Sequence, residues 1–260
     1  SVTRGLFVAG RFLGVDRLAA LRAAAGESSG LPRLVIRIPI DDGDDPAGTG
    51  SDGGRGSDGD GAAATGDGVV DWSALDERAA GVPAALADSR AGAVTPEQVS
   101  DILFTSGTTG RSKGAMSAHR QSLAVAAAWA RIGELGTSDR YLVINPFFHA
   151  FGLTLCLTFA VDMGATQVVL PRFDVDMVLS AMRRHPATFF PGVPPMFDRL
   201  ATAARERGTD MSSVRYAISG AMALDGDVAR RWEEVTGGLI IEGYGMTECS
   251  PDILGNPFNE

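Results

Sequence analysis

The chain has 260 residues, 45% hydrophobic and 21% charged, a composition typical of a globular protein with a sizeable core. The net charge is −9, but residues 41–68 hold eight aspartates, so the remainder is nearly neutral and has no basic stripe for nucleic acid. No apolar run is long enough for a transmembrane segment, and no signal peptide is evident. Cys156 and Cys249 lack metal-ligand spacing and indicate a reduced, cytoplasmic setting.

The first 40 residues alternate between strand and helix patterns. Residues 5–10 form a short apolar run, residues 15–25 follow a helical period, and residues 33–38 alternate apolar and basic side chains. A strand–helix–strand unit of this kind predicts a parallel sheet. Residues 26–30 fit the Gly-x-Ser-x-Gly spacing of a hydrolase nucleophile elbow, but a helix precedes them, so we interpret them as a helix end at Gly26 and a turn.

Residues 41–68 consist almost entirely of Gly, Asp, Ala, Ser and Thr. Such a segment cannot bury enough apolar surface to offset the entropy of ordering it, so we predict a disordered acidic loop. We therefore divide the rest of the chain into three parts. These are part of a first α/β subdomain at 1–40, a helical connection at 69–98 and a second α/β subdomain at 99–260.

A glycine- and hydroxyl-rich loop follows the apolar run at 102–104, which we interpret as a buried strand, and a helical pattern starts at about Ser117. Backbone N–H groups of such a loop can surround a phosphate, and a lysine adds a mobile positive charge. Lys113 is the only lysine among the 23 Lys and Arg residues, and Gly114 after it excludes a Walker A loop. The candidate phosphate ligands are Thr105, Ser106, Gly107, Thr108, Thr109, Gly110 and Lys113.

Strands and helices keep alternating through the rest of the chain. Strand patterns occupy residues 141–145, 167–170, 188–191 and 239–242, and helical patterns occupy residues 117–132, 175–185 and 227–235. This alternation predicts an α/β architecture with predominantly parallel sheets and flanking helices.

Two segments that follow strands carry candidate chemistry. His149 lies in an aromatic run after the strand at 141–145, and its spacing alone favours a core histidine bonded to backbone. Residues 243–248 read Gly-Tyr-Gly-Met-Thr-Glu. Because an aromatic ring can stack on a purine, a hydroxyl can donate to a phosphate and a carboxylate can hold Mg²⁺, Tyr244, Thr247 and Glu248 are candidate ligands.

The loop at 105–114 resembles the signature of the adenylate-forming (AMP-binding) superfamily, which includes acyl-CoA synthetases, luciferases and peptide-synthetase adenylation domains. It departs from that signature only at Ser112, where proline is usual. Residues 244–248 match the superfamily's Tyr-Gly-x-Thr-Glu motif at every fixed position. A turn between them resembles its Gly-Gly-Ala-Pro segment, with Ser219 and Met222 as departures.

The resemblance implies the large N-terminal domain of the acyl-CoA synthetase fold and a two-step reaction. A carboxylate attacks the α-phosphorus of Mg·ATP to give an acyl-adenylate and pyrophosphate, and coenzyme A then displaces AMP. The implied catalytic residues are Lys113, His149, Thr247 and Glu248, with Glu248 also holding Mg²⁺. The implied nucleotide contacts outside the loop are Gly220, Ala221, Tyr244, Gly245, Met246 and Thr247. The implied substrate contacts are His149, Val193 and Pro194.

The aromatic–His segment looks closest to fatty-acyl and related CoA ligases, which places the resemblance in fatty acid metabolism. It also implies a mobile C-terminal domain of the same polypeptide, so we expect these 260 residues alone to be inactive. Two alternatives stay open: a non-catalytic ATP/AMP-binding module, and an adenylation domain that loads a carrier protein. The identity of the acid and the oligomeric state are also open.

Overall fold

The computed structural model describes residues 5–9, 11–12, 15–29, 34–38, 69–105, 110 and 112–255. The chain forms two compact units, Ser1–Ala93 and Val94–Glu260, and each is described by itself. The second unit begins at Val94 rather than at residue 99. The expected acidic loop at 41–68 lies outside the described residues.

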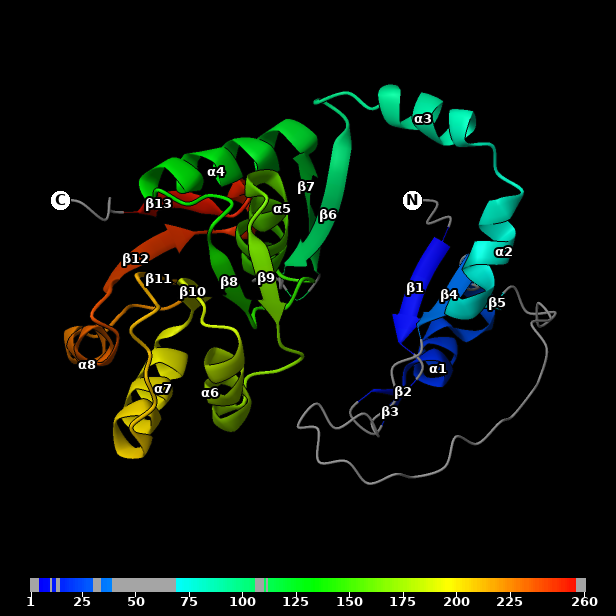
Figure 1. Cartoon of the computed structure of the whole chain (residues 1–260). Helices are drawn as coiled ribbons and strands as arrows, with labels where there is room; N and C mark the ends of the chain where they lie inside the picture. Colours follow the sequence, from blue (N-terminus) through cyan, green and yellow to red (C-terminus); the bar gives the residue numbers. More distant parts are fainter. Residues whose placement is uncertain are drawn as a thin grey trace. The chain divides into compact units, whose positions relative to one another are not determined.

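The first unit contains a parallel three-stranded sheet in the order β1–β4–β5 (Figure 1). Its elements are β1 (Gly5–Ala9), the short antiparallel pair β2 (Arg11–Phe12) and β3 (Val15–Asp16), α1 (Arg17–Ser29), β4 (Leu34–Ile38) and β5 (Val69–Asp71). They are followed by η1 (Trp72–Ala74), α2 (Leu75–Ala80) and α3 (Ala84–Gly92). The predicted strand–helix–strand unit with a parallel sheet is confirmed.

Two expectations for this unit are wrong. The helix does not end at Gly26, because α1 continues to Ser29; an internal glycine costs a helix only about 1 kcal/mol, which is too little to end it. The segment from residue 69 does not begin as a helix, because Val69 and Val70 form β5 and are buried beside β4. Two adjacent valines favour a strand when a sheet edge is available.

The second unit begins with a hairpin that the sequence did not predict. β6 (Val99–Thr105) pairs antiparallel with β7 (Lys113–Ala118), and Thr105 lies opposite Lys113 in the register. The glycine-rich loop therefore joins two strands, and α4 (His119–Ile132) starts only after the second. The expectation of a buried strand at 102–104 is also wrong, because Phe104 is 76% exposed. Two strands alone cannot cover both faces of an apolar run.

The centre of the second unit is a six-stranded sheet in the order β13–β12–β11–β10–β8–β9. Neighbouring strands are parallel except at the edge, where β13 runs antiparallel to β12. The strands are β8 (Arg140–Val143), β9 (Thr166–Val169), β10 (Phe189–Gly192), β11 (Tyr216–Ser219), β12 (Leu239–Gly245) and β13 (Asp252–Gly255). The predicted parallel α/β architecture is confirmed.

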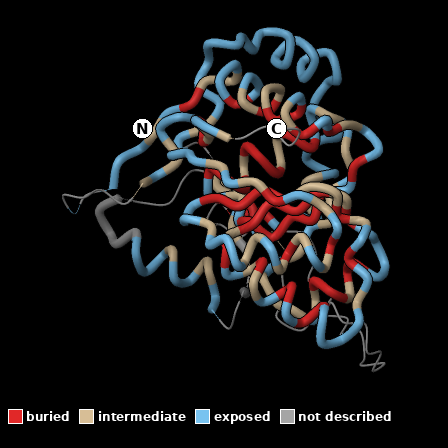
Figure 2. The backbone as a smooth tube through the Cα atoms, turned by 90° about the vertical axis from the view of Figure 1, so that its left-hand side faces the viewer, coloured by how far each residue is buried: buried red, intermediate tan, exposed pale blue. Residues whose placement is uncertain are grey.

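Helices cover both faces of this sheet (Figure 1). On one face lie α6 (Val175–Arg184), α7 (Pro194–Arg207) and α8 (Gly226–Thr236). On the other lie α4, the π-helical segment η2 (Phe151–Thr158) and α5 (Phe159–Met163). Buried residues concentrate in the strands between these layers (Figure 2). Parallel strands buried on both faces explain the nearly continuous apolar runs in their sequences.

One buried carboxylate ties the amino-terminal ends of three strands together. Asp139, just before β8, accepts two hydrogen bonds of 2.9 Å from the Arg215 guanidinium before β11. It also accepts a bond of 2.6 Å from the hydroxyl of Thr188, before β10. A bidentate arginine pair of this kind is directional as well as strong. It fixes the strands at the edge opposite to the one that carries the candidate site.

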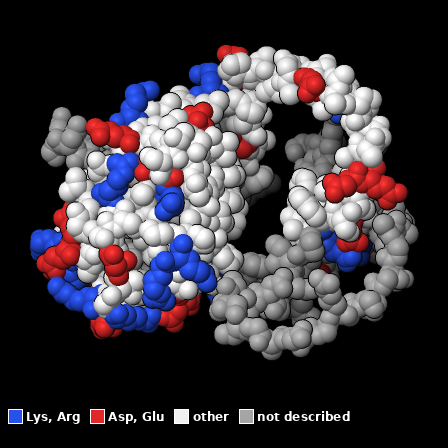
Figure 3. Space-filling view, viewed as in Figure 1, with Lys and Arg blue, Asp and Glu red and all other residues white. Residues whose placement is uncertain are grey.

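The outer surface of the helical layer carries charges of both signs. Figure 3 shows blue and red side chains interleaved over α6, α7 and α8. Several of them form ion pairs between neighbouring helices, such as Arg205 with Glu234 and Arg231 with Asp198. Exposed pairs of this kind contribute about 1 kcal/mol or less each.

Candidate active site

The candidate site lies where the parallel strands of the second unit end. The chain runs from β8 to the edge strand β9, and then crosses back to β10 on the other side of β8. In open α/β sheets, ligands bind at the carboxyl ends of strands, near such a reversal of strand order. The segments that leave β8, β11 and β12 at this edge are the ones that the sequence singled out.

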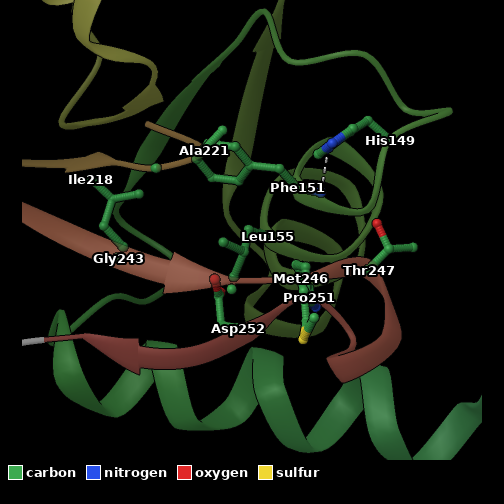
Figure 4. Close-up of a pocket in the computed structure, with 12 residues that line it drawn as sticks. His149, Phe151, Leu155, Ile218, Ala221, Gly243, Met246, Thr247, Pro251 and Asp252 are labelled. Atoms are coloured by element: carbon green, nitrogen blue, oxygen red, sulfur yellow. Dashed lines mark hydrogen bonds between the residues drawn. The ribbon is translucent and has the colours of Figure 1, made fainter. Parts of the chain in front are cut away.

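A pocket of about 240 Å³ opens between these segments (Figure 4). Most of its wall is apolar side chain or exposed backbone, and the polar side chains are few. The lining residues are His149, Phe151, Leu155, Ile218, Gly220, Ala221, Gly243, Gly245, Met246, Thr247, Pro251 and Asp252. A wall that combines apolar side chains with exposed backbone and a few placed polar groups is typical of a small-molecule site.

His149 lies two residues before η2, and its ring accepts a backbone hydrogen bond. Its Nδ1 accepts the backbone N–H of Phe151 at 3.2 Å, which Figure 4 marks with a dashed line. In the neutral ring the proton must then be on Nε2, which is free to donate to an oxygen in the pocket. Gly152 follows because a Cβ there would overlap the carbonyl of Pro146.

The segment from β12 to β13 folds back tightly around the Tyr-Gly-x-Thr-Glu motif. The backbone N–H of Met246 donates to the carbonyl of Pro251 at 2.6 Å, and Thr247 begins the short 3-10 helix η3 (Thr247–Cys249). Ser250 then turns the chain in the left-handed region, with a φ of 63°. This tight return places Thr247 and Pro251 in the same pocket.

The turn after β11 forms another wall. The backbone N–H of Gly220 donates to the carbonyl of Gly192 at 3.1 Å, which ties the turn to β10. Ala221 has a φ of 66°, an uncommon value for a residue with a Cβ, and such strain concentrates at ligand sites. Ser219, where the family motif has glycine, is fully buried at the end of β11.

Asp252 is a lining residue that sequence reasoning missed. It begins β13, a strand that the sequence did not predict, and it is followed by apolar residues. Burial raises the pKa of Asp252 to about 7, although a hydrogen bond from the side chain of Trp129 opposes the shift. No motif marked this position. Of the other lining residues, Phe151, Leu155, Ile218, Gly243 and Pro251 were also not among the candidates.

The pocket brings together six of the sequence candidates: His149, Gly220, Ala221, Gly245, Met246 and Thr247. Tyr244 is 60% exposed, and it does not line the pocket. Val193 caps α7 and Pro194 is its first residue, and neither is among the lining residues.

The phosphate-loop candidates that the structure describes, Thr105, Gly110 and Lys113, belong to the β6–β7 hairpin. Lys113 and Gly110 are exposed, and Gly110 has a φ of 88°, which a residue with a Cβ rarely adopts. Ser106, Gly107, Thr108 and Thr109 lie outside the described residues. A side-chain hydrogen bond connects the hairpin to the rest of the site: the hydroxyls of Ser117 and Ser250, both buried, are 2.9 Å apart.

Glu248, the candidate Mg²⁺ ligand, is exposed in η3. Within the described residues, no three His, Cys, Asp or Glu side chains come close enough to hold a metal. The single carboxylate of Glu248 is compatible with Mg²⁺, because proteins often hold this ion with one or two carboxylates while substrate phosphates and water supply the other ligands.

Comparisons with known proteins identify the family of the chain. The model of the AMP-binding enzyme family matches residues 32–259. A 3-[(3aS,4S,7aS)-7a-methyl-1,5-dioxo-octahydro-1H-inden-4-yl]propanoyl:CoA ligase of Rhodococcus jostii (strain RHA1) is 41% identical over 248 residues, which cover 95% of this chain and 44% of the relative. A long-chain-fatty-acid–CoA ligase of Bacillus subtilis (strain 168) is 36% identical over 162 residues, which cover 61% of this chain and 29% of the relative.

A solved structure shares the fold. The crystal structure of the anthranilate CoA ligase AuaEII in complex with anthranoyl-AMP superposes with a TM-score of 0.56 at 31% identity, over 62% of this chain and 32% of that one. The chain thus spans less than half the length of these relatives.

A parallel sheet with a pocket at its carboxyl edge is the arrangement that α/β domains use to bind small ligands. The family match identifies the class of protein. The chain belongs to the AMP-binding enzyme family, as its motifs predicted. Its named relatives are CoA ligases. No helix in the described part of the chain has the length and hydropathy needed to cross a membrane.

Proposed function

We propose that the complete gene product is an AMP-forming acyl-CoA synthetase. The observation that carries this proposal is the pocket itself, in which the His149 segment, the Gly220–Ala221 turn and Thr247 meet in a chain 41% identical to a CoA ligase. The proposal concerns the complete gene product, because the relatives are more than twice as long as this chain.

The first step joins an acid to ATP. A carboxylate oxygen of the acid attacks the α-phosphorus, the bond to the β-phosphate breaks, and pyrophosphate leaves. We assign Thr247 to the α-phosphate, and His149, through Nε2–H, to the acid's carboxylate. The loop and Lys113 take the β- and γ-phosphates, where they neutralise charge as it develops. In the second step the thiol of coenzyme A attacks the acyl carbon and AMP leaves.

The nucleotide takes the remaining candidates. We assign Tyr244 to the adenine face, beside Gly220, Ala221, Gly245 and Met246. Glu248 holds Mg²⁺, which would supply positive charge at the phosphates. Because ATP and coenzyme A are the co-substrates, we place the reaction in the cytoplasm.

We further propose that the acid has a compact ring body rather than a long alkyl chain. The relative that covers 95% of this chain is named for a propanoate attached to a dioxo-octahydroindene ring system. The long-chain-fatty-acid ligase is less similar and matches only 61% of the chain. Val193 and Pro194 stay assigned to the acyl side of the site.

Pyrophosphate release by the complete gene product tests the proposal. We expect release that depends on added acid, with AMP formation rising when coenzyme A is added. Lys113→Ala should lower kcat/KM for ATP at least about tenfold, because it removes a phosphate contact. Arg131→Ala, which removes an exposed cation at the far end of α4, is the matched control and should leave the rate unchanged.

The other outcomes separate the alternatives. Acid-dependent release without any response to coenzyme A would indicate a different acceptor, such as a carrier protein. ATP binding without release, over a panel of aliphatic, aryl and ring-bearing acids, would contradict the ligase and favour a binding module.

A further inference from the structure

The wall of the pocket contains a buried carboxyl group that no step proposed above uses. Asp252 lines the pocket, and the Trp129 side chain donates a hydrogen bond to its carboxyl group. The second oxygen, Oδ2, is buried and makes no hydrogen bond within the described part of the chain. A buried polar atom without a partner costs roughly 1–3 kcal/mol, so its presence in a ligand pocket needs an explanation.

The surroundings of Asp252 are apolar or neutral. Leu155, Ile218 and Gly243 share its side of the pocket, and Trp129 packs behind the strand pair, 3.6 Å from the position of a Cβ on Gly243. No ion pair with Asp252 is present among the described residues. With no cation nearby, the carboxyl group is stabilised in its neutral form, which carries an O–H donor.

The titratable groups on the described elements that pack against Asp252 do not supply a hydrogen-bond partner for its Oδ2. Burial raises the pKa of Tyr141 on β8 well above its ordinary value, and it raises the pKa of Cys156 on η2 to about 12, so both stay neutral near pH 7. Glu242 and Tyr244 on β12 are exposed. On α4, the neighbour of Asp252 is Trp129, whose side chain carries no charge. His149 lines the same pocket but bonds to Phe151.

Asp252 also lies away from the reacting end of the pocket. In Figure 4, His149 and Thr247 lie on one side of the view, and Asp252 lies on the other with Ile218 and Gly243. His149 and Thr247 are the residues assigned above to the carboxylate and the α-phosphate. A substrate bound with its carboxylate there would direct its body toward Asp252.

We propose that Asp252 is a specificity residue that donates a hydrogen bond from its carboxyl group to a ketone oxygen on the body of the acid. The inference rests on the proposed function, and it adds that the preferred acid carries an oxo group remote from its carboxylate. A site built to hydrogen-bond a substrate group discriminates strongly against the analogue that lacks it, because the buried partner is left unpaired. The side chain of Trp129, whose hydrogen bond to the carboxyl group opposes the rise in its pKa, helps to position Asp252.

The test compares two acids of the same size on the complete gene product. We would measure kcat/KM for acid-dependent pyrophosphate release with 3-(4-oxocyclohexyl)propanoate and with 3-cyclohexylpropanoate, at saturating ATP. We expect wild type to prefer the oxo acid by about tenfold or more. Asp252→Leu should bring this ratio to about one, because the variant removes the donor.

Asp252→Asn keeps the proposal testable if the leucine variant folds poorly. The amide oxygen can still accept from Trp129 and the amide N–H can donate, so the preference should persist. Because burial raises the pKa of Asp252 to about 7, the wild-type ratio should fall as the pH rises from 6 to 8.5, whereas the asparagine ratio should stay flat. His149 meets the carboxylate of both acids equally, so its contribution cancels in the ratio.

A purely structural role for Asp252 predicts a different pattern. Both acids would then lose the same factor in each variant, and the ratio would stay constant. That result, or a wild-type ratio near one with measurable release from both acids, overturns the specificity role and leaves the ligase proposal intact. Absence of release with any acid overturns the ligase proposal and this inference together.

Discussion

At the scale of single residues, two glycines of the same strand illustrate how closely the site is packed. Gly243 and Gly245 both belong to β12 and both line the pocket. A Cβ on Gly245 would overlap the carbonyl of Pro251, whose oxygen is fixed by the N–H of Met246. A Cβ on Gly243 would make only an ordinary contact of 3.6 Å with Trp129.

We therefore expect Gly245→Ala to be much more harmful than Gly243→Ala. The alanine must push the Pro251 segment away from β12, which moves Thr247 as well. The rate of acid-dependent pyrophosphate release should fall about 100-fold or more for Gly245→Ala, since misplacement of about 1 Å can cost that much. For Gly243→Ala the loss should be several-fold at most. Similar losses in both variants, measured at equal folded fractions, would contradict the steric argument.

The residue scale also shows what the sequence could predict of the site. His149, Gly220, Ala221, Gly245, Met246 and Thr247 were predicted because they belong to motifs, and the structure places all six in one pocket. Leu155, Ile218 and Asp252 were missed because nothing in their local sequence separates them from core or surface residues. Their position depends on the packing of η2, β11 and β13, which only the folded chain defines.

At the scale of elements, a buried side-chain pair connects the hairpin β6–β7 to the Thr-Glu motif. Ser117 on β7 and Ser250 after η3 share a hydrogen bond of 2.9 Å, although 133 positions separate them in the chain. Lys113 lies on the same strand as Ser117. The pair therefore links the strand of the lysine to the turn that follows Thr247 and Glu248.

We expect a double-mutant cycle to reveal this link. Ser117→Ala and Ser250→Ala should each lower the free energy of unfolding by about 1–2 kcal/mol, because each leaves a buried hydroxyl unpaired. The double variant should cost less than the sum, with a coupling of at least about 0.5 kcal/mol. Urea unfolding of the 260-residue chain measures these values, and Ser138→Ala, at an exposed position, is the control. Strict additivity would mean that the pair does not couple.

Elements differed in how well the sequence predicted them. β8 was predicted from its continuous apolar run, β10 from two phenylalanines followed by proline and glycine, and α6 from a helical apolar period over ten residues. β7 was missed because Lys-Gly-Ala-Met-Ser-Ala has no β-branched residue, so its strand conformation comes from pairing with β6. β5 and β13 were missed because each offers only two adjacent aliphatic residues beside an aspartate, a residue that strands disfavour.

At the scale of the whole molecule, the second unit has a core that differs sharply from its edges. Phe190, Phe197 and Trp232 pack as an aromatic cluster, with centroids 4.9–5.6 Å apart, between β10, α7 and α8. The hairpin is different, since Phe104 and Met116 are 76% and 67% exposed. Elements with few buried contacts open locally at low free energy.

Amide hydrogen exchange on the 260-residue chain should follow this gradient. We expect the slowest exchange in β8, β10 and β11, which are covered on both faces, and exchange at least about 100-fold faster in β6 and β7. Mass spectrometry of peptides from each strand measures the rates. Protection of the hairpin equal to that of the central strands would contradict this gradient of local stability.

The pocket is assembled from separate connections, and this assembly affects how the pocket can change in evolution. Its walls come from three connections that are far apart in the sequence: η2 after β8, the turn after β11, and the return from β12 to β13. Each connection is anchored to a strand whose own side chains face the helical layers. Amino-acid substitutions can therefore alter one of these connections while the sheet and the other connections stay unchanged. The return from β12 to β13 carries both Thr247, which we assign to the nucleotide, and Asp252, which we assign to the acid, so a change in this one connection would alter both roles at once.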